Sequence, residues 1–194
     1  MSKQIFIVFG HNNYKSGSSF NAAVRDTFIE EAKKIGHKID LVNIYEEKQL
    51  KFWDGDKPDE QILNYRKRLE EADIMLIMSP CHNYIMNSAT ENFIANVFTP
   101  PWAFKYKKLI FNYGYPIPNA LKGKTAIVSI SYGGPNFFYS AVIQQIPRRI
   151  KKMVFSGLAG MRCQYMRFYE VLPNMPKEVF EKHMEKVRKT VQQL

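Results

Sequence analysis

Two uninterrupted apolar runs constrain the fold of this chain more than any other feature. The first is Ile5–Phe9 and the second lies within Asp73–Met78, and each is followed by a loop and a helical pattern. A strand has this composition when both of its faces are buried, as happens in a parallel sheet. The runs therefore predict an α/β domain, in which ligands lie at the carboxyl ends of the strands.

Strand and helix patterns alternate along the rest of the chain. Besides the run from Ile5, strands are expected over Lys38–Ile44, Asp73–Met78, Thr125–Ser131 and about Met161–Val171. Helices are expected over Ser19–Ile35, Asp59–Glu71, about Ser88–Phe98, about Phe138–Phe155 and from Pro176 to the end. The aromatic-rich segment Trp102–Ala120 is interpreted as irregular. This order predicts one doubly wound domain over residues 1–194, with a five-stranded parallel sheet and helices on both faces.

Charge and composition limit the classes of partner. A net charge of +10 over 194 residues favours polyanions, which include nucleic acid, anionic membrane surfaces and phosphorylated cofactors. Nucleic acid is the least favoured, because no recognition motif accompanies the charge. No apolar run reaches the roughly 18 residues of a membrane span, and no signal peptide precedes the first strand, so a cytoplasmic protein is expected. Cys81 and Cys163 have no metal-ligand spacing, and no metal is expected.

Three of the predicted strands end in loops suited to a ligand: residues 10–21, 80–88 and 131–139. The first loop offers hydroxyls and helix N–H groups to phosphates, and the second offers backbone amides and carbonyls to a flat heterocycle. Gly133 and Gly134 in the third let a backbone approach closely. A planar cofactor that carries phosphate is the simplest inference. Because neither a Walker A pattern nor GxGxxG follows the first strand, flavin fits better than a nucleoside triphosphate.

The first loop resembles the His-x(n)-Ser-Phe-Asn-x-Ala element of the flavodoxin-like NAD(P)H:quinone oxidoreductases. The matching residues are His11, Ser19, Phe20, Asn21 and Ala23. Four further segments agree with the family in its order: Pro80–Tyr84, Ala103–Tyr106, Leu121–Lys124 and Ser131–Tyr139. The resemblance covers about residues 4–172. It implies a flavodoxin-like three-layer sandwich with strand order 2-1-3-4-5.

The resemblance also implies which residues would hold the flavin. The phosphates would lie against His11, Ser18, Ser19, Phe20 and Asn21, and an FAD adenine would also lie near His11. The ring would be lined through the main chain by Pro80, Cys81, His82, Asn83 and Tyr84, and its other edge by Ser131, Tyr132, Gly133 and Gly134. Tyr139 would sit beside the redox-active side as the catalytic candidate. Substrate would be capped by Trp102, Phe104 and Tyr106, which would reach across a homodimer interface, and by Phe138.

Three departures from the family pattern bear on these roles. Residues Asn13–Gly17 are inserted ahead of the Ser-Phe-Asn element, and Asn83 stands where well-studied members have an aromatic residue. Gln145 replaces the histidine that those members pair with the tyrosine. Glutamine takes up no proton near neutral pH, so Tyr139 would need water or His82 as its partner.

The resemblance implies a reductase that passes a hydride from NAD(P)H to FMN or FAD and then two electrons to a quinone, in a ping-pong cycle. The alternative is a flavin-bearing regulatory or redox-sensing subunit with little turnover. A one-electron carrier fits less well, because such carriers are small and acidic. Each of these residues also has a purely structural interpretation. His11 would cap a loop carbonyl, and Ser19 would only cap the helix. Tyr139 would be an ordinary buried tyrosine, and the aromatic residues of Trp102–Tyr115 would belong to the core.

Overall fold

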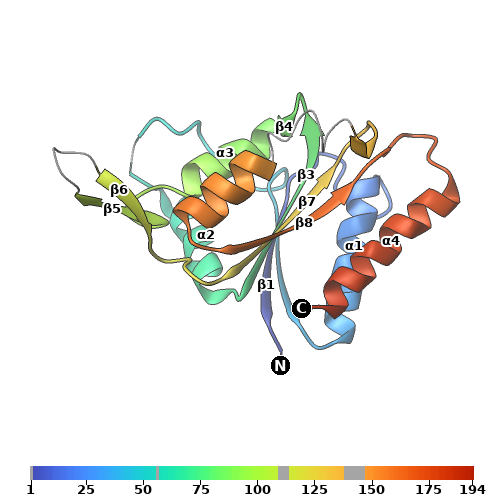
Figure 1. Cartoon of the computed structure of the whole chain (residues 1–194), viewed down its shortest axis with the longest axis horizontal. Helices are drawn as coiled ribbons and strands as arrows, with labels where there is room; N and C mark the ends of the chain where they lie inside the picture. The colour runs from blue at the N-terminus through green and yellow to red at the C-terminus, as the bar shows by residue number, and fades with distance from the viewer. Residues whose placement is uncertain (1, 56, 109–113, 138–146) are drawn as a thin grey trace.

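We describe the fold from a computed structural model of the chain, which covers residues 2–55, 57–108, 114–137 and 147–194. Five parallel strands form its central sheet (Figure 1). In order across the sheet they are β2 (Lys38–Asn43), β1 (Gln4–Phe9), β3 (Ile74–His82), β7 (Thr125–Ser131) and β8 (Arg162–Phe168). The short strand β4 (Ile85–Met86) pairs antiparallel with the end of β3. The predicted strand order 2-1-3-4-5 is confirmed.

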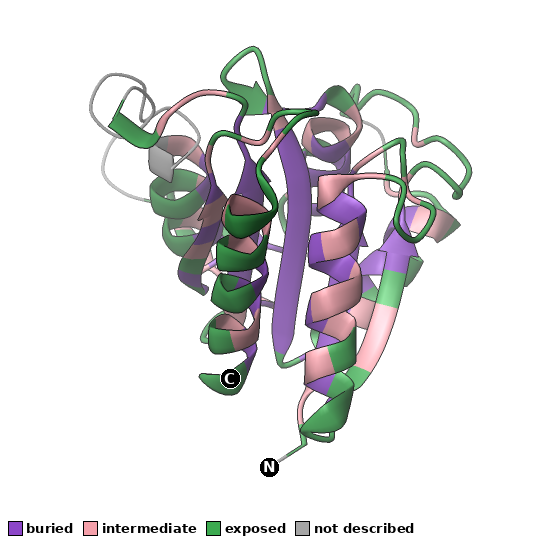
Figure 2. Ribbon diagram, turned by 90° about the vertical axis from the view of Figure 1, so that its right-hand side faces the viewer, coloured by how far each residue is buried: buried purple, intermediate pink, exposed green. Residues whose placement is uncertain are grey.

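Helices cover both faces of this sheet. One face carries α1 (Phe20–Lys34) and α4 (Lys177–Gln192), and the other carries α2 (Glu60–Glu71), α3 (Ser88–Val97) and η3 (Pro147–Leu158), a helix of π type. Figure 2 shows a largely exposed outer face on α4, a mostly intermediate one on α1, and a buried strand between the two helices. The three layers predicted from the sequence are therefore present.

The apolar run at the N-terminus forms the strand in the second position of the sheet, where both faces are covered. Phe6 and Val8 of β1 face the core under α2 and α3, whereas Ile5, Ile7 and Phe9 face the core under α1 and α4. None of these five side chains has any exposed surface. Each contributes about 1.5–3 kcal/mol of burial energy, which explains why the run contains no polar residue.

The segment Trp102–Ala120, interpreted as irregular, contains a β-hairpin instead. Strands β5 (Phe104–Lys108) and β6 (Gly114–Pro118) pair antiparallel and project from the body of the molecule (Figure 1). Phe104 is buried and anchors the hairpin in the core, while the four residues after it in β5 are exposed: Lys105, Tyr106, Lys107 and Lys108. Pro116 and Pro118 lie in β6, and among the described strands only β5 pairs with it, so no second strand there needs their missing N–H groups.

The last third of the chain differs from the prediction at its boundaries. The helix expected over about Phe138–Phe155 starts at residues that lie outside the described part, and its described portion η3 continues through Gly157 to Leu158. The chain turns at Gly160, whose φ of 68° is left-handed and suits glycine. The strand expected over Met161–Val171 is shorter, since β8 ends at Phe168 and Glu170 has a φ of 57°.

A buried polar cluster joins the carboxyl ends of β1 and β3 to the start of α3. Asn87 caps α3: its side-chain oxygen accepts from the N–H of Thr90 (3.0 Å) and from the Thr90 hydroxyl (2.8 Å). Its amide nitrogen donates to the carbonyl oxygen of Gly10, and its backbone N–H donates to Ser79 Oγ (3.1 Å). Gly10 in turn donates its N–H to the Met78 carbonyl (2.8 Å). These bonds hold the end of β1, the end of β3 and the start of α3 in fixed positions relative to one another, so the loops that begin there leave from fixed points.

Gly10 has no room for a side chain in this cluster. A Cβ atom at Gly10 would lie 1.9 Å from Thr90 Oγ1 and 3.1 Å from the Met78 carbonyl oxygen. Gly10→Ala is therefore expected to lower the free energy of unfolding by about 1–3 kcal/mol, the usual cost of overpacking. Urea denaturation measures this effect. Gly133→Ala is the matched control, because its Cβ would meet no atom within 4 Å. An unchanged denaturation midpoint for Gly10→Ala would show that the polar cluster shifts to make room for the added methyl group, and would contradict this expectation.

Candidate functional site

The three loops selected from the sequence do meet at one edge of the sheet. Asn21 at the start of α1 donates from its amide nitrogen to Ser131 Oγ at the end of β7 (3.0 Å), and both residues are buried. The bond from Asn87 to Gly10 connects the first loop to the segment that follows β3. One contiguous surface therefore carries the ends of β1, β3 and β7.

The first loop is held by its own hydrogen bonds. Ser19 caps α1, since its hydroxyl oxygen accepts from the N–H of Ala22 (3.1 Å), and the hydroxyl donates to the Asn13 carbonyl (2.9 Å). Ser18 donates its hydroxyl to the Lys15 carbonyl (2.6 Å). Because a hydroxyl has one hydrogen to donate, both donors are already in use. Lys15, exposed and the only charged residue between Gly10 and Asn21, is then the side chain best placed by charge to attract an anion.

Phe20 anchors the start of α1. Its ring makes edge-to-face contacts with Phe168 (5.3 Å between centroids), Phe180 (6.2 Å) and His183 (5.5 Å). The ring is thus engaged with β8 and α4, and a phosphate contact from Phe20 would come from its backbone N–H. The first turn of α1 contains no acidic residue that would oppose an anion.

The second loop is a tight hairpin between β3 and β4. Cys81 pairs with Met86 and His82 with Ile85, so Asn83 and Tyr84 form the two-residue turn. Both turn residues have positive φ, 48° and 64°, the combination that such hairpins use. The left-handed conformation is common for asparagine and costly for tyrosine, so the surrounding pairing must hold Tyr84 in it. His82, Asn83 and Tyr84 are exposed, as a ligand-facing turn requires.

The third loop starts from a stacked pair of tyrosines. Tyr132 is buried and its ring lies parallel to that of Tyr169, with centroids 5.2 Å apart and planes at 13°. Its N–H donates to the Phe168 carbonyl (2.8 Å), and its carbonyl accepts from Val171 (3.0 Å). Gly133 beyond it is exposed, with open space where a Cβ would be. The backbone can therefore be approached at this point.

Three ionisable side chains of this surface, those of Cys81, Tyr132 and His11, are shifted towards their uncharged forms. Burial raises the pKa of Cys81 and of Tyr132, so thiol and phenol keep their protons. Burial and the nearby charge of His82 lower the pKa of His11. Its ring nitrogen Nδ1 accepts from the N–H of Asn13 (3.0 Å). These groups suit binding and positioning better than nucleophilic catalysis.

The aromatic residues proposed to cap the substrate differ in how far they are buried. Phe104 belongs to the core, and the indole of Trp102 donates to Glu70 Oε1 while Arg66 lies over its ring. Tyr106 in contrast is 63% exposed. Of the three, Tyr106 is the residue available to a second subunit. Phe138, Tyr139 and Gln145 lie outside the described residues.

Sequence reasoning missed two groups of residues at this edge. The cluster of Asn87 and Thr90 was missed, although an asparagine directly before a helical pattern is a capping signal. Tyr169 had no local signal, because its stacking on Tyr132 depends on the pairing of β7 with β8. In the described ranges, no group of three or more His, Cys, Asp or Glu side chains is arranged to hold a metal ion. No helix there is long and apolar enough to cross a membrane.

The influence of His82 on His11 gives a test of this geometry. The pKa of His11 is expected to lie below the ordinary value of about 6.5, and His82→Gln is expected to raise it, because a neighbouring positive charge is removed. NMR titration of the imidazole signals measures both values. Lys38→Gln, which removes a cation at the amino edge of the sheet, serves as the control. A His11 midpoint that His82→Gln leaves unmoved would place the two rings too far apart to interact.

Comparison with known proteins identifies the fold family. The model of one family, described as the flavodoxin-like fold, matches residues 3–193. No curated protein matches the chain. A putative quinone reductase from Klebsiella pneumoniae has a TM-score of 0.83 at 17% identity, over 98% of this chain and 84% of that one. An FMN-dependent NADH-azoreductase from Bacillus anthracis, solved with FMN, has a TM-score of 0.76 at 17% identity, over 100% and 99%.

A third solved structure extends the same likeness. An NAD(P)H:quinone oxidoreductase from Methanothermobacter marburgensis has a TM-score of 0.75 at 16% identity, over 99% of this chain and 96% of that one. Identities at this level establish a shared fold. The family match spans nearly the whole sequence and agrees with the observed strand order. The chain therefore belongs to the flavodoxin-like fold family.

Proposed function

We propose that this protein is a flavin-dependent NAD(P)H oxidoreductase that reduces a quinone or a related acceptor. The observation that carries the proposal is the meeting of three loops at one sheet edge. They are an acid-free loop at the start of α1, a hairpin with an exposed turn, and an open glycine turn. Each supports one part of a phosphate-bearing planar ligand. The proteins of similar fold named above include a quinone reductase and an FMN enzyme, which supports FMN over FAD.

The phosphate end would be bound by the first loop. The N–H groups of the first turn of α1 carry positive partial charge, and Lys15 adds a full one. His11 would approach as a neutral ring, because its pKa is lowered. Ser18 and Ser19 would help to bind the phosphate indirectly, because their hydroxyls hold the loop in shape through bonds to the carbonyls of Lys15 and Asn13. A direct hydrogen bond from either hydroxyl to the phosphate would require it to rotate away from its carbonyl.

The ring end would lie between the second and third loops. Bound flavin supplies the redox chemistry, accepting a hydride from NAD(P)H and giving two electrons to the acceptor. The turn would present the backbone N–H of Asn83 along one edge, and such a fixed donor stabilises negative charge. Gly133 and Gly134 would allow approach along the other edge, with Tyr132 as a protonated, buried support.

A second subunit would complete the substrate site. Tyr106 lies on the projecting hairpin with most of its surface exposed, so it is the residue we assign to a partner's site in a homodimer. Trp102 and Phe104 would hold the base of the hairpin in place, because they pack within their own chain.

Lys15 gives a direct test of the phosphate assignment. Lys15→Ala is expected to weaken FMN binding by roughly tenfold to a hundredfold, the worth of one charge-assisted hydrogen bond. Fluorescence quenching of FMN on binding measures the affinity. Lys33→Ala, which removes an equally exposed lysine at the other end of α1, should leave it unchanged. Equal affinities of the two variants for FMN would show that Lys15 does not contact the phosphate and would contradict the assignment of the phosphate to this loop.

Steady-state kinetics separate the reductase from the regulatory subunit. With FMN bound, NADPH or NADH oxidation by a soluble quinone is expected above about 1 per second, with parallel double-reciprocal lines at several quinone concentrations. Turnover below about 0.1 per second with every acceptor, despite bound flavin, would favour the regulatory alternative. Exposed apolar residues at the site edge, such as Phe137 and Ile85, supply a surface for a partner protein in that case.

A further inference from the structure

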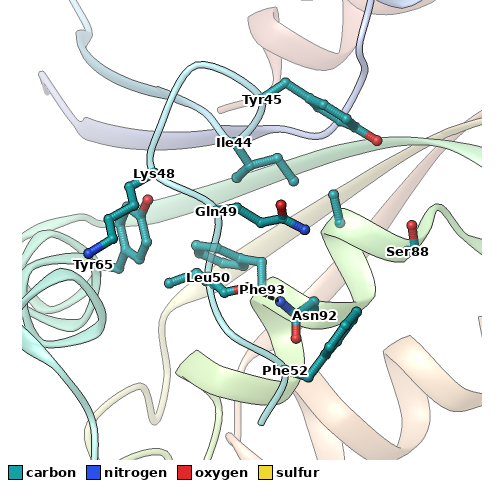
Figure 3. A pocket seen from close by; sticks show the side chains of 11 residues that line it. Ile44, Tyr45, Lys48, Gln49, Leu50, Phe52, Tyr65, Ser88, Asn92 and Phe93 are labelled. Atoms are coloured by element: carbon teal, nitrogen blue, oxygen red, sulfur yellow. Dashed lines mark hydrogen bonds between the residues drawn. The ribbon is translucent and has the colours of Figure 1, made fainter.

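A separate cavity of about 170 Å³ lies between the segment 44–52 and helix α3 (Figure 3). The buried rings of Tyr65 and Phe93 line its inner side, and the exposed rings of Tyr45 and Phe52 line its rim. None of the described residues proposed above for flavin lines it. A hollow of about 150 Å³ with apolar walls is enough to hold benzene, so this one accommodates a single six-membered ring.

The segment over the cavity is held from both sides. From α3, Asn92 donates its amide to the Leu50 carbonyl (3.0 Å), and Asn96 donates to the Lys51 carbonyl (3.1 Å). From α2, Gln61 donates to the Lys48 carbonyl (2.9 Å). These bonds fix the backbone above the hollow, so a ligand would enter a preformed space and little ordering would oppose its binding.

Polar groups lie on two sides of this hollow. In Figure 3 the amide of Gln49 points to the side where Ser88 begins α3, whereas Lys48 extends beside the ring of Tyr65. Lys48 is the only charged side chain among the described residues that line the cavity, and no carboxylate is among them. An aromatic ring would thus find aromatic walls. A carboxylate on the Tyr65 side would find the ammonium group of Lys48, and a hydroxyl at the other end of the ring would find the amide of Gln49 and the hydroxyl of Ser88.

We infer that this cavity binds a single-ring aromatic carboxylate, at a site distinct from the flavin loops. Its four aromatic side chains account for the ring, its volume limits the ligand to one ring, and its charge selects an anion. The inference does not depend on the proposed function, because the described residues of the proposed flavin site do not line the cavity.

Titration of the full chain with 4-hydroxybenzoate, followed by NMR with FMN present and again without it, tests the inference. The backbone amide signals of Gln49, Ser88 and Ala89 are expected to shift, with a dissociation constant in roughly the millimolar range for so small a ligand. Shifts confined to residues 10–19 and 131–134 would assign the ligand to the flavin loops instead. A chain that takes up no flavin but shifts these signals would reject the proposed function and keep the cavity site.

Two variants and one analogue define the site. Ala89→Leu fills the hollow and should weaken binding at least tenfold, and Phe52→Ser should weaken it by removing an exposed wall. Ala95→Leu, on an exposed position of α3 outside this cavity, should leave affinity unchanged. Hydroquinone, which has the ring but no carboxylate, should bind at least fivefold more weakly. Unchanged binding by both Ala89→Leu and Phe52→Ser, or equal binding of hydroquinone, would overturn the inference.

Discussion

The side chain of Asn87 fixes three elements at once, and the placement of the candidate site depends on it. Its amide donates to the carbonyl of Gly10 at the end of β1, and its oxygen accepts from Thr90 in α3, while its backbone N–H reaches Ser79 in β3. All of these groups are buried, so a bond left unmade would cost about 1–3 kcal/mol. The loops that leave this edge therefore start from rigid points, although most of their own residues are exposed.

The charges of the side chains at the candidate site indicate whether these residues bind a ligand or react with it. Burial keeps Cys81 and Tyr132 protonated and His11 neutral, so none of these three is set up as a nucleophile or a charged acid at neutral pH. Lys15 and the start of α1 supply positive charge instead. A surface of this kind binds and orients a reactive group rather than supplying one, which is the division of labour found between proteins and their redox cofactors.

Patterns that act over short distances made most of the fold predictable. The unbroken run at Ile5 correctly predicted a strand with two buried faces. Ser18 and Ser19, which precede an apolar helical pattern, were both candidates for the helix cap, and Ser19 is the residue that caps α1. The failures concern the segments after α3. The hairpin of β5 and β6 depends on cross-strand pairing and on Phe104 in a distant core. Helix η3 runs past the expected end at Phe155 and continues through the exposed Gly157 to Leu158. At the site, loop positions followed from strand ends, whereas the Asn87 cluster and the Tyr132–Tyr169 stack needed the tertiary structure.

The measurement that tests the central claim most directly is the visible spectrum of the purified protein, reconstituted with FMN or FAD and freed of unbound flavin. The account predicts a stoichiometric flavin band that bleaches when NADPH or NADH is added without air, and mass analysis of the released chromophore identifies FMN or FAD. Flavin that stays oxidised with both donors would contradict the reductase, and a protein that retains neither flavin would contradict the assignment of the sheet edge as a flavin site.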